Sequence, residues 1–191
     1  KSMKQATYEE AFYCLKEEIA REYRRHDKIL DSLDQEEERE KFRRFAAWKA
    51  QPEEYLGALR FLSECLFQVS GKKSVILIDE YDVPLENAYF GGFYDRMVSL
   101  VRSLFESALK TNDCLEFAVV TGCLRISKES IFTGLNNLNV VSITSDTFAE
   151  HFGFTQDEVE KMLGDYGLEE NLQTVQKWYD GYRFGETEVY N

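Results

Sequence analysis

A short run of aliphatic and β-branched residues, Ser74 to Ile78, constrains the fold of this chain more than any other feature. The run follows Gly71-Lys72-Lys73, and the two acids Asp79-Glu80 come directly after it. A continuous apolar run of this length between polar flanks is typical of a strand buried on both faces. Such strands occur in parallel sheets covered by helices, so the sequence predicts an α/β fold.

Helical periodicity surrounds this strand in the sequence. Apolar residues recur every three or four positions over residues 7–33 and again over 94–109, which predicts amphipathic helices that cover a sheet. Two more β-branched runs, residues 114–121 and 139–143, predict neighbouring strands. Strands that alternate with long helices are typical of a doubly wound parallel sheet.

The pattern changes after residue 147. We expect residues 1–147 to form a partial α/β core and residues 148–191 to begin a small helical or winged-helix-like lid. Thr155-x-x-Glu158 has the form of a capping box, which predicts that a helix begins there. Only helices are expected after Ser145. Residues 144–191 are acidic, with 11 Asp and Glu against 3 Lys and Arg.

Composition excludes several classes of protein. The net charge of −12 over 191 residues is a poor match for a nucleic-acid backbone. No segment approaches the roughly 18 apolar residues that a membrane span needs, so no membrane partner is expected. The four cysteines are widely separated and form no C-x-x-C pair. This pattern favours free thiols in a cytoplasmic protein.

Asp79 and Glu80 are the first candidate site residues. They follow a predicted buried strand, and open α/β sheets bind ligands at the carboxyl ends of their strands. The arrangement is typical of a Walker B strand in P-loop ATPases, in which Asp79 would bind magnesium and Glu80 would activate water. A strand that ends in two solvated acids would give the same letters.

The second predicted strand ends in VVTGCLRIS, which supplies two more candidates. Thr121 stands where P-loop ATPases with an added central strand place a residue that senses the γ-phosphate. Arg125, four residues further on, could contribute a positive charge to a phosphate. A Thr-Gly turn followed by a surface arginine is the structural alternative.

A phosphate-binding loop is missing from the sequence. G-x-x-x-x-G-K-[ST] does not occur, and the Gly71-Lys72 pair precedes a strand rather than a helix. We therefore expect these 191 residues to bind ATP weakly or not at all. We also expect them to belong to a longer protein in which such a loop precedes Lys1, or else to a domain that has lost it.

Four motifs occur in an order that resembles a known family: LIDEYDVPLENAY, TGCLRISKESIFTGLNN, EHFGFTQDEV and WYDGYRFG. Together they are similar to the bacterial AAA-ATPase-like family, whose members are often fused to a PD-(D/E)XK nuclease-like domain. The resemblance is strongest over residues 75–191.

The resemblance implies a P-loop ATPase core with ATP and magnesium as cofactors, a helical lid, and a nuclease-like domain after Asn191. It places the Walker B acids at Asp79 and Glu80, the sensor at Thr121, and Arg125 in a TG-x-x-RIS motif. Through the effector domain it implies nucleic acid as a partner of the longer protein, and it leaves open whether the protein forms a homo-oligomer.

Three functions are compatible with these residues. In the first, the chain is the central part of an ATPase that drives an attached effector domain. In the second, it is a non-enzymatic scaffold or interaction module built on a degenerate ATPase fold. The third is a DEAD-type helicase, because Asp79-Glu80-Tyr81-Asp82 fits D-E-x-D. That class also needs a Ser-Ala-Thr motif, which the sequence lacks.

Overall fold

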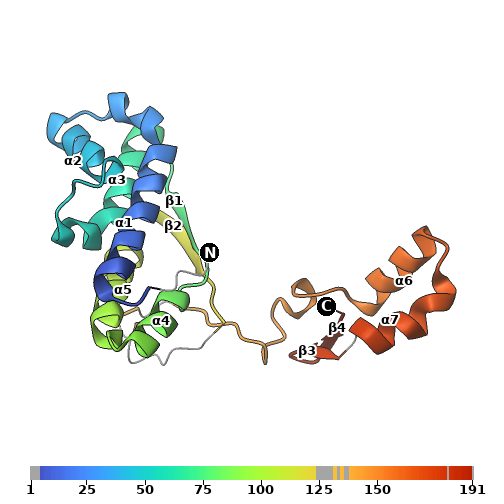
Figure 1. Cartoon of the computed structure of the whole chain (residues 1–191). Coiled ribbons are helices and arrows are strands. Elements are labelled where there is room, and N and C mark those ends of the chain that lie inside the picture. The colour runs from blue at the N-terminus through green and yellow to red at the C-terminus, as the bar shows by residue number, and fades with distance from the viewer. Residues whose placement is uncertain (1–4, 124–130, 133, 136–137, 180, 191) are drawn as a thin grey trace. The chain divides into compact units, whose positions relative to one another are not determined.

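The computed structural model describes residues 5–123, 131–132, 134–135, 138–179 and 181–190 (Figure 1). Contacts divide the chain into two compact units, Lys1–Asn136 and Asn137–Asn191, which we call unit 1 and unit 2. Each is described by itself below. The functional division into a core over residues 1–147 and a lid over 148–191 stays a prediction.

Helices make up most of unit 1. In chain order its elements are α1 (Tyr8–Arg25), η1 (Asp27–Ser32), α2 (Glu36–Ala46), η2 (Pro52–Gly57), α3 (Ala58–Ser70), β1 (Ser74–Ile78), α4 (Val83–Gly91), α5 (Tyr94–Leu109) and β2 (Leu115–Val120). The single helix predicted over residues 7–33 is wrong in its second part. The His26 N–H bonds to the Tyr23 carbonyl three residues back, and a 3₁₀ helix follows. This change brings Leu33 into the core, where it is fully buried.

An aromatic cluster holds α1, α2 and η2 together. Tyr23, Phe42, Phe45 and Tyr55 are all at most 1% exposed. The rings of Tyr23 and Phe45 stack with centroids 4.7 Å apart, and Tyr23 and Phe42 meet edge to face at 4.8 Å. The buried Tyr23 hydroxyl donates a 2.7 Å hydrogen bond to the Ala58 carbonyl, so its polar end is satisfied where α3 begins.

The two strands of unit 1 are parallel, as predicted. The register pairs Val75 with Phe117, Leu77 with Val119 and Ile78 with Val120. Ile78 and Val120 point toward a second core cluster, which α5 supplies with a buried stripe. That stripe consists of Met97, Val98, Leu100, Val101, Leu104, Phe105 and Ala108.

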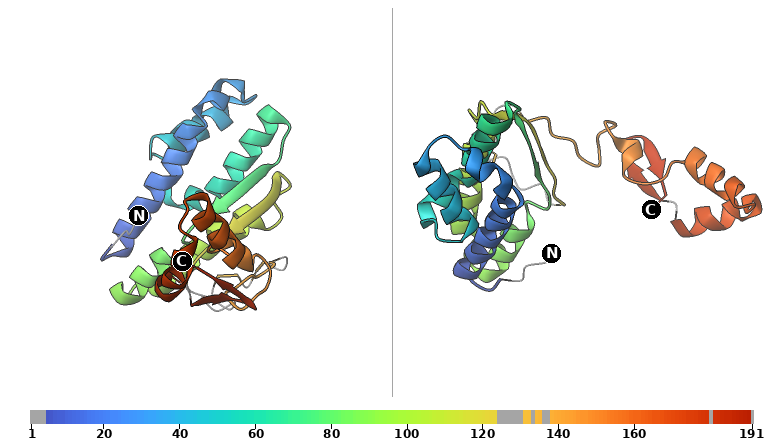
Figure 2. Two further views of the ribbon diagram at one scale, coloured as in Figure 1. Left: turned by 90° about the vertical axis from the view of Figure 1, so that its right-hand side faces the viewer. Right: turned by 90° about the horizontal axis from the view of Figure 1, so that it is seen from above.

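The opposite face of this sheet is open, which corrects the expectation that β1 is buried on both faces. Leu77 is 73% exposed and Val75 47%, and their partners Phe117 and Val119 are 53% and 45% exposed. Both sets of views show α1, α3 and α5 on the same side of the two strands (Figures 1 and 2). The sequence pattern indicates only that these residues are apolar. It does not distinguish a sheet covered by helices on one face from a sheet covered on both faces.

The strand predicted over residues 139–143 is also absent. Residues 138–142 have no regular structure, although Val140 and Val141 are apolar and exposed. Strand propensity is realised only where a partner backbone supplies the hydrogen bonds. Among the described residues, the parallel sheet therefore has two strands.

Unit 2 combines short helices with a small antiparallel hairpin. Its elements are η3 (Ala149–His151), α6 (Gln156–Asp165), η4 (Glu169–Asn171), α7 (Leu172–Tyr179), β3 (Tyr182–Phe184) and β4 (Thr187–Val189). The predicted capping box is confirmed, because the Thr155 side chain accepts from the Glu158 N–H and Glu158 accepts from the Thr155 N–H. The expectation of helices alone is wrong. Gly185, at φ +56°, lies in the tight turn between β3 and β4.

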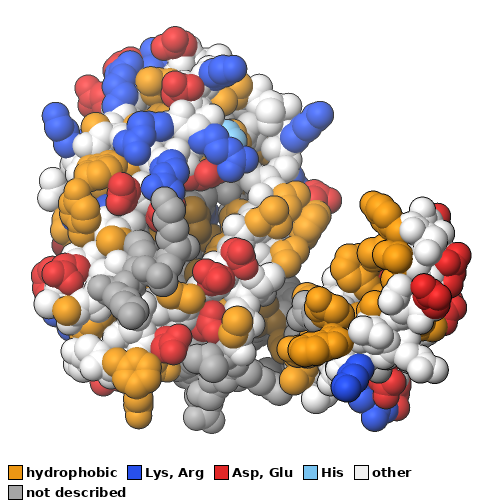
Figure 3. All heavy atoms as spheres, turned by 45° about the vertical axis from the view of Figure 1, so that its right-hand side comes forward, with side chains coloured by type: hydrophobic (Ala, Val, Ile, Leu, Met, Phe, Trp, Pro, Cys, Tyr) orange, Lys and Arg blue, Asp and Glu red, His pale blue; other side chains and the backbone are white. Residues whose placement is uncertain are grey.

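Unit 2 exposes much apolar surface for its size. Figure 3 shows apolar side chains gathered on the surface of unit 2. Trp178 and Tyr166 are 75% and 78% exposed, whereas Val159 and Val189 are buried. The described part of the chain contains no helix with the length and apolar character required to cross a membrane.

Burial of the Cys65 thiol makes a prediction about alkaline stability. Cys65 is 1% exposed in α3, and burial, assisted by Glu38 and Glu64, raises the pKa of its thiol from 9.0 to about 12. The folded state thus favours the protonated thiol. Its contribution is complete below pH 9 and is lost as the pH rises from 9 toward 12. We expect the unfolding free energy of the wild type to fall more steeply over this window than that of Cys65→Ala. Urea titrations at pH 8, 9, 10 and 11 measure both slopes, and equal slopes would contradict the prediction.

Candidate functional site

The candidate site lies where β1 and β2 end. Asp79 and Glu80 directly follow β1, and Thr121 directly follows β2. Because the strands are parallel and Ile78 pairs with Val120, the next residues of both strands, Asp79 and Thr121, come side by side. Three of the four residues predicted from the sequence are thus gathered at one end of the sheet. Arg125, the fourth, lies outside the described residues.

A side-chain hydrogen bond joins the two strand ends. The Thr121 hydroxyl donates to Oδ1 of Asp79. Both residues are exposed, so the Asp79 carboxylate keeps access to solvent on its other side. A carboxylate that is oriented by a neighbouring donor and still open to solvent is suited to bind a cation.

The backbone changes course at Glu80. The Thr121 N–H donates to the Ile78 carbonyl at 2.9 Å, and the Thr121 carbonyl accepts from the Tyr81 N–H at 3.1 Å. In a regular parallel ladder the second donor would be the N–H of Glu80. Glu80 is therefore an extra residue, as in a β-bulge, and it adopts a left-handed conformation with φ +54°.

Left-handed backbone is unfavourable for a residue with a Cβ, by about 1–2 kcal/mol. Strained residues of this kind gather at functional sites, where the surrounding structure holds them in place. Here the two backbone hydrogen bonds of Thr121 supply that restraint. Glu80 therefore follows Asp79 directly in the chain and is exposed, but it lies outside the regular hydrogen-bond pattern of the two strands.

Gly122 and Asp82 belong to this site, although no role was predicted for them. A Cβ on Gly122 would lie 2.6 Å from the Tyr81 ring and 2.8 Å from Oδ1 of Asp82. Only glycine allows this approach, so the tip of β2 packs directly on the turn that carries the acids. Asp82 is 3% exposed and stands immediately before α4. The glycine two residues after the strand, in VVTG, was the available sequence signal, because such glycines mark close backbone approach.

The Tyr81 side chain anchors this turn to the core. Its ring meets Phe132 edge to face at 5.2 Å and Phe105 at 6.4 Å. Phe105 belongs to the buried stripe of α5. The turn that carries the acids is therefore fixed by two sets of contacts. The Tyr81 ring packs against Phe105 and Phe132, and the backbone of the turn contacts the residues that follow β2.

The donor set decides which cation fits. Among the described residues no cluster of three or more His, Cys, Asp or Glu side chains could hold a metal ion. Magnesium commonly takes one or two carboxylates and completes its shell with water and phosphate oxygens. The exposed Asp79 carboxylate fits that mode of binding.

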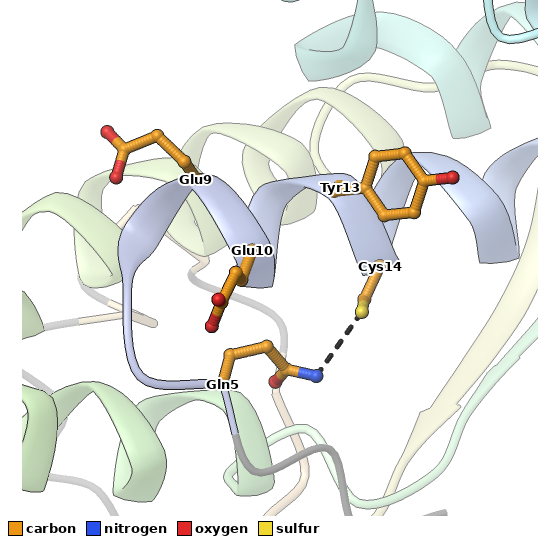
Figure 4. A pocket seen from close by; sticks show the side chains of 5 residues that line it. All are labelled: Gln5, Glu9, Glu10, Tyr13 and Cys14. Atoms are coloured by element: carbon orange, nitrogen blue, oxygen red, sulfur yellow. Dashed lines mark hydrogen bonds between the residues drawn. The ribbon is translucent and has the colours of Figure 1, made fainter.

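A separate surface hollow lies at the start of α1 and contains none of these residues. It is lined by Gln5, Glu9, Glu10, Tyr13 and Cys14 (Figure 4). Its polar groups have partners within the protein: the Ala6 N–H donates to Glu10 at 2.9 Å, the Gln5 amide donates to the Cys14 sulfur at 3.2 Å, and Arg96 of α5 donates to Glu9 at 3.2 Å. We assign it a structural role, because these contacts fix the start of α1 and join it to α5.

Comparison with known proteins identifies the family. The sequence profile of a family described as "Predicted AAA-ATPase" matches residues 1–132, which include β1, β2 and the site. The chain belongs to the AAA-ATPase-like family. The resemblance is thereby confirmed at the level of the family, over residues 1–132; the motifs EHFGFTQDEV and WYDGYRFG lie outside the match.

One curated relative also matches this AAA-ATPase-like chain. It is the "Uncharacterized protein in vnfD 5'region" of Azotobacter chroococcum mcd 1, which is 33% identical over 123 residues. The match spans 63% of the present chain and 23% of the relative, so the matched segment corresponds to about a quarter of that protein. No solved structure matches the chain.

Proposed function

We propose that this chain is part of a magnesium-dependent ATPase with a P-loop-type core, in which the ends of β1 and β2 form the catalytic edge. The observation that carries the proposal is the joined pair Asp79 and Thr121 beside the bulged Glu80. Membership of the AAA-ATPase-like family supports nucleotide as the ligand of this edge.

Each residue has a role in this proposal. Asp79 holds magnesium, directly or through water, and Glu80 polarises the water that attacks the terminal phosphate. Thr121 would sense that phosphate, and Arg125 would contribute positive charge to it. Bound magnesium would neutralise charge on the phosphate oxygens. Hydrolysis would then act through a lid, formed by residues 148–191, on an attached effector that is nuclease-like and contacts nucleic acid.

The test compares the complete gene product with the 191-residue chain. We expect phosphate release from ATP by the complete protein, dependent on magnesium and abolished by a chelator. The chain alone is expected to release none, because its sequence contains no G-x-x-x-x-G-K-[ST] loop to cradle the phosphates. Hydrolysis by the chain alone would contradict this account of the missing loop.

The same missing loop motivates a second candidate, a non-enzymatic scaffold on a degenerate ATPase fold. The open apolar face of the sheet also favours an interaction module, because large exposed apolar patches mark binding surfaces. A complete protein that neither binds nor hydrolyses nucleotide, while still assembling with a partner, would favour this candidate over the ATPase.

A further inference from the structure

The Thr121 hydroxyl already has a hydrogen-bond acceptor within the protein, unlike a hydroxyl that is free to bind a phosphate. A hydroxyl carries one proton and can donate only one hydrogen bond at a time. The Thr121 hydroxyl already donates to Oδ1 of Asp79. The same proton is therefore not free for a phosphate oxygen while this bond exists.

The backbone fixes the position from which that bond is made. The Thr121 N–H is bonded to Ile78 at 2.9 Å, and its carbonyl accepts from Tyr81 at 3.1 Å. Thr is also β-branched, so few χ1 rotamers are available to it. Backbone and side chain together aim the hydroxyl at Asp79 without any ligand.

Asp79 needs such a partner more than a buried acid would. It is exposed, and it follows the last residue of β1, where the strand no longer restrains its side chain. A free carboxylate samples several rotamers, and freezing them on metal binding lowers affinity. The hydrogen bond from the Thr121 hydroxyl restricts the Asp79 rotamers before a metal binds, so less conformational entropy is lost on binding. It also leaves the second carboxylate oxygen of Asp79 available to the metal.

We propose that Thr121 is a positioning residue that holds the Asp79 carboxylate ready for a divalent cation. The metal in this inference rests on the proposed function, whereas the orientation of Asp79 does not. Any contact of Thr121 with a terminal phosphate requires that its hydroxyl first leave Asp79. The two contacts are alternatives, because the Asp79 carboxylate and a phosphate oxygen would compete for the one proton of the Thr121 hydroxyl.

The experiment uses Thr121→Val, which keeps the branched shape but removes the hydroxyl, and Thr121→Ser, which restores the hydroxyl. NMR couplings across χ1 of Asp79 are measured in the metal-free chain. We expect one rotamer in the wild type, averaging in Thr121→Val, and recovery in Thr121→Ser. Thr174→Val, an exposed Thr on α7, is the matched control and should leave Asp79 unchanged. Unchanged amide signals of β1 and β2 establish that each variant is folded.

Cation affinity is measured next, from Mn²⁺ broadening of the Asp79 amide signal. Loss of a side chain that hydrogen-bonds to a metal ligand commonly lowers metal affinity by about 10–100-fold, so we expect Thr121→Val to weaken Mn²⁺ binding by about 10-fold. An unchanged Asp79 rotamer in folded Thr121→Val would overturn the inference. If the rotamer changes as expected but the wild type binds no Mn²⁺, positioning is supported and the metal role proposed for Asp79 fails instead.

Discussion

Glu80→Gln is expected to lower ATP turnover by the complete AAA-ATPase-like protein by at least about 100-fold while nucleotide affinity stays unchanged. Glutamine has nearly the shape of glutamate but cannot take a proton from water. It also keeps a Cβ, so the left-handed backbone at φ +54° is equally strained in both proteins. The change therefore isolates the carboxylate.

Phosphate release measures turnover, and a fluorescent nucleotide measures binding. Glu86→Gln is the matched control, because Glu86 is an exposed acid in the first turn of α4 and lies outside the bulge. We expect that control to behave as the wild type does. Unchanged turnover in Glu80→Gln would contradict the catalytic role proposed for Glu80, and it would not bear on the role proposed for Asp79.

Two neighbouring positions in β1 should respond very differently to the same substitution. Ile78→Thr is expected to lower the unfolding free energy of unit 1 by about 2 kcal/mol, because Ile78 packs against the α5 cluster and Thr would place a hydroxyl there. Leu77→Thr should change it by less than about 0.5 kcal/mol, because Leu77 is 73% exposed. Thr is β-branched, so strand propensity is retained at both sites.

Urea unfolding followed by Trp fluorescence measures these differences. The chain has two tryptophans, Trp48 in unit 1 and the exposed Trp178 in unit 2, so a Trp178→Phe background restricts the signal to unit 1. Equal losses at both positions would mean that the sheet is covered on both faces, as the sequence pattern alone suggested.

Local signals in the sequence were reliable where neighbouring residues decide the structure. The capping box at Thr155 forms because Glu158 is close enough in the chain to complete it. The apolar stripe over residues 94–109 became the buried face of α5, and the two main apolar runs became β1 and β2. Asp79 and Thr121 were each named as residues that follow a strand, and the parallel pairing of β1 and β2 places them side by side.

Features that depend on distant partners, or that are too short to give a periodic signal, were missed. Residues 139–143 have the composition of a strand, but in the described structure they form no strand ladder; the Ile143 carbonyl accepts a single backbone hydrogen bond, from the Gly185 N–H at 2.8 Å. The hairpin of β3 and β4 was overlooked because its strands are three residues each, too short for a periodic signal. The bulge at Glu80 comes from two hydrogen bonds to Thr121, forty-one positions away in the chain.

For residues Ser74 to Asp82, some features follow from the sequence alone and others only from the tertiary structure. By itself the sequence determined that a strand forms and that Asp79 and Glu80 lie at its carboxyl end, because these depend on adjacent residues. The tertiary structure alone decided that one face of the strand is open and that Thr121 holds Asp79. It also decided that Glu80 turns away from the ladder, because burial, hydrogen-bond partners and strain depend on which distant segments meet.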